Sequence, residues 1–179
     1  MTIACSPSRV GFVTSSLSVV WSSGTRGSIC SCEHGLALSS PRRRLRVAGS
    51  GPDEAAARRY AKELGIAHRV EFMGWVDGAD KWTLLSDGRL VVVPSRREVC
   101  GIVALEALAA GTPVLAFDIP CIREVLPAEC TWRVTPFDVD SLAEALADVC
   151  GRRPDARHRC TVSGLRPALR LGCAGCSAV

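Results

Sequence analysis

Two glutamates flank a stretch of the chain that is almost wholly apolar. Glu98 and Glu106 lie within the segment SRREVCGIVALEALAAGTPV, residues 95–114. Residues 101–110 have the pattern of a helix, in which Glu106 has apolar neighbours one turn before it and one turn after it. A carboxylate withdrawn from water is costly unless it has partners. Glu106 therefore either pairs with a protein group or accepts hydrogen bonds from the hydroxyls of a ligand.

The residues between the glutamates could bind an anion. Gly101 stands at the expected start of the helix, directly after the loop 94–100. The first amides of a helix have no partner within it, and the helix dipole favours negative charge there. The amides of Gly101, Ile102 and Val103 thus predict a phosphate site. If all the intervening residues were helical, the two glutamates would be about 12 Å apart along the axis, which would span a sugar diphosphate.

Two structural interpretations need no ligand, and the spacing leaves them open. Ser95-x-x-Glu98 before an apolar run also fits a capping box, in which the two side chains satisfy backbone amides at a helix start. Glu106 could equally be a structural acid held by a neighbouring loop amide or an arginine.

The central part of the chain alternates between strand-like and helix-like segments. This alternation implies right-handed crossovers and a parallel sheet between helices. Residues 44–150 therefore predict an α/β fold, a Rossmann-like three-layer domain with a mostly parallel sheet. Ligands of such sheets bind beyond the carboxyl ends of the strands, where Glu98 and Gly101 are expected. The expected strands are 45–49, 69–74, 89–95, 112–118 and 131–136, and the expected helices are 53–65, 79–86, 101–110, 121–126 and 140–150.

The two flanks differ from the centre in charge. Residues 45–150 contain 11 basic and 16 acidic residues, whereas the flanks contain 11 basic and 2 acidic residues. Residues 1–43 form a leader with Ser, Arg and Cys, for which we expect low structure or one strand within residues 10–21. Without that strand an apolar sheet edge would be uncovered, and the chain would self-associate through it. Residues 151–179 form a basic, Cys-containing tail that we expect to be disordered.

The distribution of the cysteines indicates the cellular compartment of the protein. Cys100, Cys121, Cys130 and Cys150 are scattered singly through the central segment, which favours free thiols in a reduced, cytoplasmic protein. A Ser-rich leader without acids leaves an organellar location as the alternative. No apolar run reaches the roughly 18 residues of a membrane span, so no integral membrane segment is expected.

The flanks also offer a different class of function. Cys30-x-Cys32-x-His34 and Cys173-x-x-Cys176, the latter with His158 and Cys160 upstream, do not match the spacing of a standard zinc site. The basic residues lack the interleaved aromatic residues of a nucleic-acid surface. We therefore expect no metal and no nucleic acid, and a zinc or nucleic-acid site in the flanks remains a third hypothesis.

The motifs of the central segment resemble a known family. Residues 44–150 are similar to the C-terminal, nucleotide-sugar-binding half of a GT-B retaining glycosyltransferase, of the group one type called family four. In the segment 91–118, seven residues separate Glu98 from Glu106, as in the two-glutamate signature of that family. The motifs are LRVAGSGP (45–52), VEFMGWV (70–76), VVVPSRREVCGIVALEALAAGTPVLAFD (91–118) and IREVLP (122–127).

The resemblance implies a role for each matching residue. Glu98 would lie beside the hydroxyls of the donor sugar and would be the catalytic residue, and Glu106 would accept hydrogen bonds from the ribose hydroxyls. The donor would be a nucleoside-diphosphate sugar, with no metal and no cofactor. The protein would act by electrostatic stabilisation of the leaving diphosphate, with retention at the anomeric carbon. The implied donor-binding residues are Gly49, Gly51, Gly74, Glu98, Cys100, Gly101, Ile102, Val103 and Glu106.

Three departures from the family pattern shape the hypotheses. Cys100 stands where an aromatic residue is usual, only Arg26 is available where a Gly-Arg…Lys-Gly segment is expected, and the acceptor-binding domain is absent. The first hypothesis is a glycosyltransferase-derived domain for transfer of a hexosyl group, incomplete or inactive alone, which leaves enzyme status open. The second is a non-catalytic module that binds a nucleotide sugar or docks with a separate acceptor-binding domain.

Overall fold

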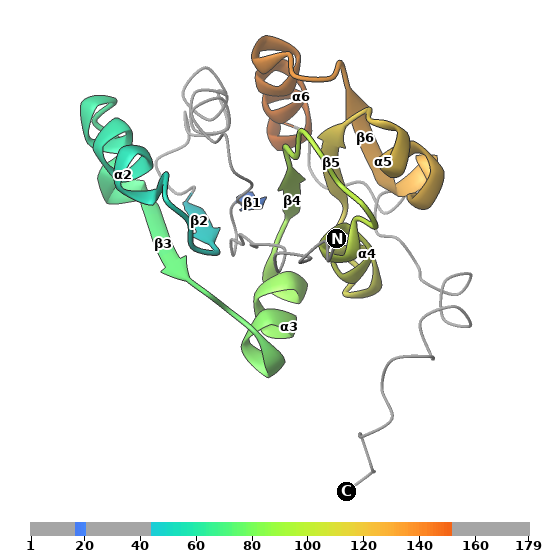
Figure 1. Cartoon of the computed structure of the whole chain (residues 1–179), viewed down its shortest axis with the longest axis horizontal. Coiled ribbons are helices and arrows are strands. Elements are labelled where there is room, and N and C mark those ends of the chain that lie inside the picture. The colour runs from blue at the N-terminus through green and yellow to red at the C-terminus, as the bar shows by residue number, and fades with distance from the viewer. Residues whose placement is uncertain (1–16, 21–43, 152–179) are drawn as a thin grey trace, which may run out of the picture.

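The chain forms one sheet with helices on both faces. In the computed structural model the described residues are 17–20 and 44–151, with side chains described for 44–149. Within them six strands, all parallel to their neighbours, follow the order β3-β2-β1-β4-β5-β6 (Figure 1). The strands are β1 (Leu17–Val20), β2 (Leu45–Ala48), β3 (Val70–Gly74), β4 (Leu90–Val93), β5 (Val114–Phe117) and β6 (Thr131–Val134).

The helices cover the sheet as right-handed crossovers require. α2 and α6 lie on one face, and α3 and α4 lie on the other (Figure 1). The predicted Rossmann-like three-layer arrangement is thereby confirmed. The helices are α2 (Glu54–Glu63), α3 (Gly78–Asp87), α4 (Ile102–Ala109), α5 (Pro120–Val125) and α6 (Val139–Gly151), with 3-10 turns η2 (Ala67–Arg69) and η3 (Ala128–Cys130).

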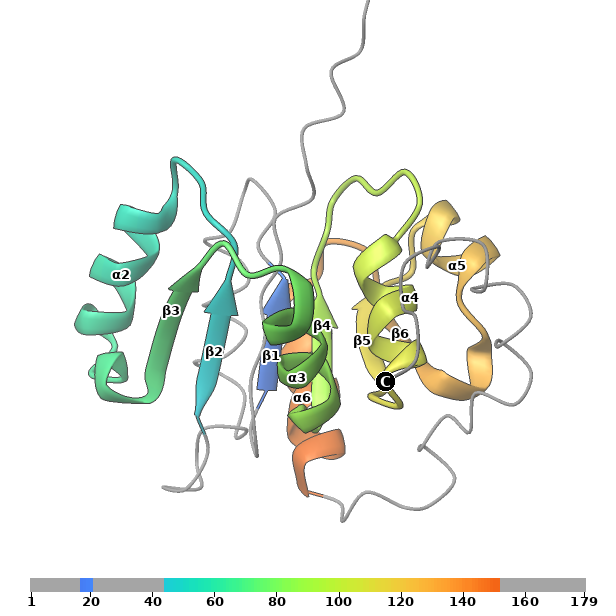
Figure 2. The same cartoon turned by 90° about the horizontal axis from the view of Figure 1, so that it is seen from below.

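The leader supplies the strand that the sequence left open. β1 pairs with β2 on one side and with β4 on the other, so that Leu17 is opposite both Leu45 and Leu90. It therefore lies in the middle of the sheet (Figure 2). The uncovered apolar edge that we expected without this strand does not arise, because the outer strands of the described sheet are β3 and β6. The condition under which we expected self-association is therefore not met.

The order of connections reverses between β1 and β4. From β1 the chain continues to β2 and β3 on one side, whereas β4 leads to β5 and β6 on the other. Because all the strands are parallel, the loops that follow them meet at one edge of the sheet, which we call the carboxyl edge. The reversal point of such a sheet is where ligands bind. The predicted site residues follow β2, β3 and β4 and therefore all belong to this edge.

The core is centred on β4 and β5. Every residue of these two strands is buried, as expected for unbroken apolar runs covered on both faces. α6 packs against β5 and β6, and α4 packs against β4 and β5. The position of α4 is thus fixed by the best-buried part of the molecule. The largest fully buried side chains are Leu45, Leu85, Leu90, Leu108, Leu115, Ile122, Leu142 and Leu146.

Candidate functional site

The loop after β4 turns into α4 at a glycine. Gly101 is the N-cap residue and has φ 56° and ψ 33°, a left-handed conformation that glycine adopts without the steric cost of a Cβ. No side chain caps this helix, which begins at Ile102, and Ser95 is buried before the loop with 2% exposure. The capping-box interpretation is therefore wrong. The backbone reverses at Gly101, so the helix starts well beyond the place that a capping box would require.

Glu98 lies in the loop and not on the helix. The distance that we expected along a continuous helix axis therefore does not apply. A Cβ placed on Gly101 would be 3.8 Å from Cγ of Glu98 and 3.5 Å from Cδ1 of Ile122 in α5. The side chain of Glu98 thus lies beside Gly101. The structure brings this side chain next to the helix start that is predicted to bind an anion.

Glu106 is paired within the protein. Its Oε1 accepts a hydrogen bond of 2.5 Å from Nζ of Lys81, which α3 contributes. The two side chains are 17% and 22% exposed. Glu106 is therefore largely out of solvent, as its helix pattern predicts, but its partner is a lysine and not a loop amide or an arginine. In the sequence, Lys81 is distinctive only as one of two lysines, with Lys62, among 22 basic residues.

The tips of β2 and β3 are tied together at the same edge. The amide of Gly49 donates a 2.5 Å hydrogen bond to the carbonyl of Gly74. Both residues have positive φ, 111° and 68°, so glycine suits both positions. Gly51 begins the turn into α2, where its carbonyl accepts a hydrogen bond of 3.1 Å from the amide of Glu54. Two of the four predicted donor-binding glycines are thus in direct contact.

Two free thiols accompany Glu98. Cys100 is exposed and Cys121, at the start of α5, is half-buried. Burial raises the pKa of the Cys121 thiol, and the nearby Glu98, Cys100 and Glu124 raise it further. The prediction of free thiols is confirmed for Cys100 and Cys121. It is wrong for Cys130, which is disulfide-bonded. Isolated spacing in a sequence does not reveal which cysteines the fold brings together.

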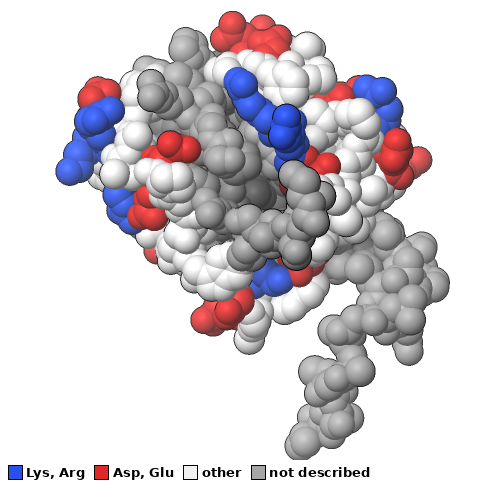
Figure 3. Space-filling model, viewed as in Figure 1, with Lys and Arg blue, Asp and Glu red and all other residues white. Residues whose placement is uncertain are grey.

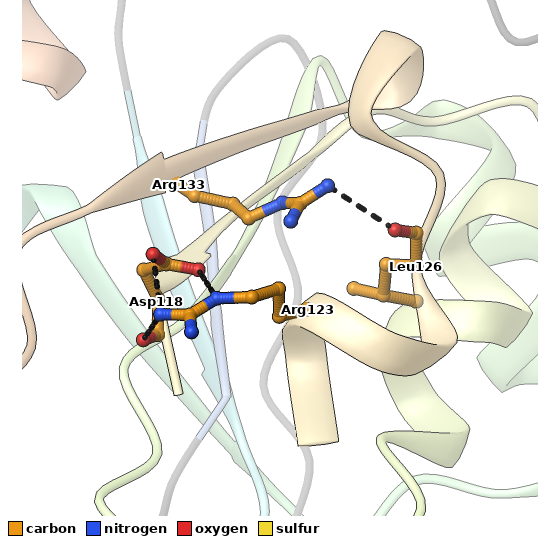
Figure 4. Close-up of polar contacts among 4 residues, drawn as sticks. All are labelled: Asp118, Arg123, Leu126 and Arg133. Carbon is orange, nitrogen blue, oxygen red and sulfur yellow. Dashed lines mark hydrogen bonds and ion pairs between the residues drawn. The ribbon is translucent and has the colours of Figure 1, made fainter. Parts of the chain in front are cut away.

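An ion pair lies at the carboxyl edge, directly after β5 (Figure 4). Arg123 binds both carboxylate oxygens of Asp118, at 2.8 Å and 3.2 Å, and also donates to the Asp118 carbonyl. The hydrogen bond from Arg123 holds the pKa of Asp118 below its ordinary value, and the positive charge of Arg133 lowers this pKa further. Arg133 itself donates to the carbonyl of Leu126 at 3.5 Å. Arg123 is therefore already neutralised and is a poor candidate for binding a phosphate.

Phe137 is a feature that the sequence did not predict. It is the one non-glycine residue with positive φ, 65°, within the described ranges, and it is 47% exposed. The guanidinium of Arg96 lies 5.4 Å from the centre of its ring, and the ring of Phe117 meets it edge-on at 5.9 Å. Arg96 and Phe137 thus connect the loop after β4 to the loop after β6. Nothing in the sequence pattern predicts that a phenylalanine adopts a positive φ at this position.

A hollow of about 430 Å³ lies against α3, and neither glutamate lines it. The side chains of α3 that line it recur at helical spacing, and Lys81, which reaches Glu106, is not among them. The hollow borders the predicted site only through the loop after Gly74. We therefore place the candidate site around α4 and not in this hollow. Its lining is Arg46, Met73, Trp75, Val76, Asp77, Asp80, Thr83, Leu84 and Asp87.

The described residues give no support to a metal or nucleic-acid site. They contain no group of three His, Cys, Asp or Glu residues arranged to hold a metal ion. On the face shown in Figure 3, acidic and basic side chains are interspersed among the described residues, without an extended basic patch. The cysteines and histidines considered for zinc lie outside the described residues. Of the helices that are described, none has the length and apolar character needed to cross a membrane.

Comparisons with known proteins agree with this architecture. The model of the family described as "Glycosyl transferases group 1" matches residues 30–164. An uncharacterised glycosyltransferase of Methanocaldococcus jannaschii, MJ1607, is 39% identical over 102 residues, which cover 56% of this chain and 26% of that protein. The chain spans between 12% and 30% of the length of the first three curated relatives.

Solved structures show the same fold. The catalytic domain of cholesterol-α-glucosyltransferase from Helicobacter pylori superposes with a TM-score of 0.64 at 21% identity, covering 81% of this chain and 91% of that chain. HepE from Anabaena, solved in complex with UDP and glucose, gives a TM-score of 0.51 at 26% identity, covering 61% of this chain and 29% of that chain.

Proposed function

Because the chain belongs to the group 1 glycosyl transferases and forms a C-terminal half of the GT-B type, we propose that its carboxyl edge binds a nucleoside-diphosphate sugar. The observation that carries the proposal is the geometry at Gly101. A left-handed glycine there turns the chain so that the first amides of α4 open at the reversal point of the sheet, with the side chain of Glu98 beside Gly101. Such amides bind a diphosphate without a metal.

We assign the two glutamates to different parts of the donor. Glu98, in the loop, accepts hydrogen bonds from hydroxyls of the sugar, and Glu106, in the second turn of α4, accepts them from the ribose. Gly49, Gly51 and the loop after Gly74 line the nucleotide. HepE was solved with UDP and glucose, which supports a uridine nucleotide as the first donor to test.

The reaction that we propose is transfer of a hexosyl group with retention at the anomeric carbon. As the bond to the sugar breaks, negative charge develops on the leaving diphosphate. The amides of Cys100, Gly101, Ile102 and Val103, together with the dipole of α4, stabilise that charge. No described side chain is placed to act as a nucleophile, so the role of Glu98 is to orient the sugar and to stabilise its developing positive charge.

The acceptor is held by a separate domain that docks on the carboxyl edge. Most of the large apolar side chains that are exposed in the described part of the chain lie at this edge: Trp75 (50%), Val99 (85%), Ile102 (55%) and Phe137 (47%). Apolar groups gathered on one side of a protein mark an interaction surface. We therefore expect the 179-residue chain to bind the donor but not to turn it over alone.

Thermal unfolding with UDP, GDP, ADP and their sugar conjugates tests the donor site. A ligand at about 100 times its dissociation constant should add about 2.7 kcal/mol, which is roughly 5–10 °C for a chain of this size. Glu106→Gln should reduce the shift with nucleotides and with nucleotide sugars alike. Glu98→Gln should reduce only the additional shift that the sugar provides. A cooperatively folded protein that shifts with none of these ligands would refute the proposal.

A further inference from the structure

The ion pair between Lys81 and Glu106 connects two helices that face the same part of the sheet. Lys81 lies in the first half of α3, and Glu106 lies in α4; the two helices pack against each other on one face. Only one carboxylate oxygen, Oε1, is used by the lysine. Within the described residues, Oε2 of Glu106 has no hydrogen-bond partner in the protein. One oxygen of Glu106 is thus held by the protein, and the other is left for a ligand.

Burial separates this pair from an ordinary surface ion pair. Its side chains are 17% and 22% exposed, whereas the exposed fractions are 24% and 52% for Arg46 and Glu71 and 49% and 28% for Arg58 and Glu54. A charged hydrogen bond gains strength where water is partly excluded. Removing its ammonium partner would leave the Glu106 carboxylate partly desolvated and free to rotate.

We propose that Lys81 is a positioning residue for ribose recognition, which holds Glu106 in one orientation so that Oε2 accepts hydrogen bonds from the 2′- and 3′-hydroxyls. The inference rests on the proposed function of Glu106. A carboxylate fixed beforehand loses less conformational entropy when the ribose binds, so the pair raises affinity without touching the nucleotide. Lys81 thereby also contributes to the choice of ribonucleotides over deoxynucleotides.

Two other roles for Lys81 make different predictions. If its ammonium left Glu106 and bound the diphosphate, its loss would weaken every nucleoside diphosphate equally, whatever the sugar. If it only joined α3 to α4, its loss would lower the free energy of unfolding without a preference among ligands. The dependence of affinity on the ribose hydroxyls therefore separates positioning from both alternatives.

The experiment is isothermal titration calorimetry on the full 179-residue chain. The ligands are UDP, GDP and ADP, each beside its 2′,3′-dideoxy counterpart. The variants are Lys81→Met, which removes the charge, Lys81→Arg, which retains it, and Glu106→Gln. Lys62→Met is the matched control, because Lys62 is the other lysine and is exposed at the end of α2. Thermal unfolding of each variant shows that it is folded, and Lys81→Gln replaces Lys81→Met if the latter is not.

We expect Lys81→Met to weaken the ribonucleotide about tenfold, the effect of one charge-assisted hydrogen bond, and to leave the dideoxy nucleotide unchanged. Lys81→Arg should recover most of the loss, and Lys62→Met should have no effect. Equal losses for both ligands, or no difference between Lys81→Met and Lys62→Met, would overturn the inference while the donor site stood. If Glu106→Gln left ribonucleotide affinity intact, the assignment of Glu106 under the proposed function would itself be wrong.

Discussion

Strands β4 and β5 are buried at every residue, whereas no residue of β3 is fully buried and Glu71 within it is exposed. Helices cover β4 and β5 on both faces. The β2–β3 side instead carries the exposed ion pair of Arg46 with Glu71 and borders the hollow beside α3. The half of the sheet that holds α4, Glu106 and Gly101 is thus the better packed. The half that holds Gly49 and Gly74 is less buried at its outer strand, β3, although three of the four residues of β2 are buried.

This difference indicates how the two ends of a ligand would be held. The groups proposed to bind the sugar, the diphosphate and the ribose stand on elements fixed by the core. The loops proposed to line the rest of the nucleotide stand on the less buried half. We therefore expect sugar and phosphate geometry to be insensitive to mutations in β2 and β3, and the choice of base to be the more adaptable property.

The largest expected effect tests the packing of the two halves directly. Leu115→Ala in β5 should lower the free energy of unfolding by about 2–5 kcal/mol, because Leu115 is fully buried. Leu64→Ala, after α2, should cost less than half as much, because Leu64 is only partly buried. Urea unfolding measures both. Equal losses would show that the two halves are packed alike.

A smaller effect separates stability from binding. Gly101→Ala and Gly65→Ala both place a Cβ on a left-handed residue, with φ 56° and 70°, at a cost of about 1–2 kcal/mol each. Neither Cβ meets an atom closer than 3.5 Å, so similar losses of stability are expected. Only Gly101→Ala should also weaken nucleotide binding, since it disturbs the amides of α4. Calorimetry with UDP on both variants checks this, and equal effects on binding would contradict the place given to Gly101.

The smallest effect is a dependence on pH that belongs to the β5–β6 side. Arg123 lowers the pKa of Asp118, and hydrogen bonds from Ser141 lower the pKa of Asp138 at the start of α6. Carboxyls with lowered pKa stabilise the fold above their ordinary pKa, and this contribution is lost as the pH falls through the lowered value. Acidification below the ordinary carboxyl range should therefore destabilise the protein.

Asp118→Asn and Asp138→Asn should each be less stable at neutral pH and should lose less stability on acidification. Thermal unfolding at a series of pH values measures both slopes. Arg123→Met added to Asp118→Asn serves as the control, because it should change the pH slope no further. A different slope in the double variant would show that Arg123 also affects the titration of a second carboxylate.

Much of the fold could be predicted because the apolar pattern is regular. The strand–helix alternation from Leu45 onward, the start of α4 near Gly101 and the burial of Glu106 all follow from local periodicity. The place of β1 did not follow, because a four-residue strand shows no pattern that says which neighbours it pairs with. The predicted strand 131–136 ends at Val134, and in the turn that follows it Phe137 adopts a conformation that its residue type disfavours.

The candidate site was predictable in composition but not in geometry. Local sequence placed Glu98, Gly101 and Glu106 at the end of one strand. It also placed Glu98 in the loop before the helix, but it left a capping box open as an alternative, because the same residues fit that motif. It also did not pair Lys81 with Glu106, since these residues lie on different helices and only the crossover of the sheet brings them together.

The central position of β1 has a consequence for how the chain folds during synthesis. β1 is made before β2 and can pair with it soon afterwards, but its other partner, β4, is made later, and the paired residues Leu17 and Leu90 lie far apart in the chain. Contacts between residues so far apart in the chain make folding slow. Until β4 is made, the nascent sheet keeps a free backbone edge along β1, which other chains can pair with. This risk of aggregation along β1 therefore belongs to the growing chain, because β4 covers that edge in the finished sheet.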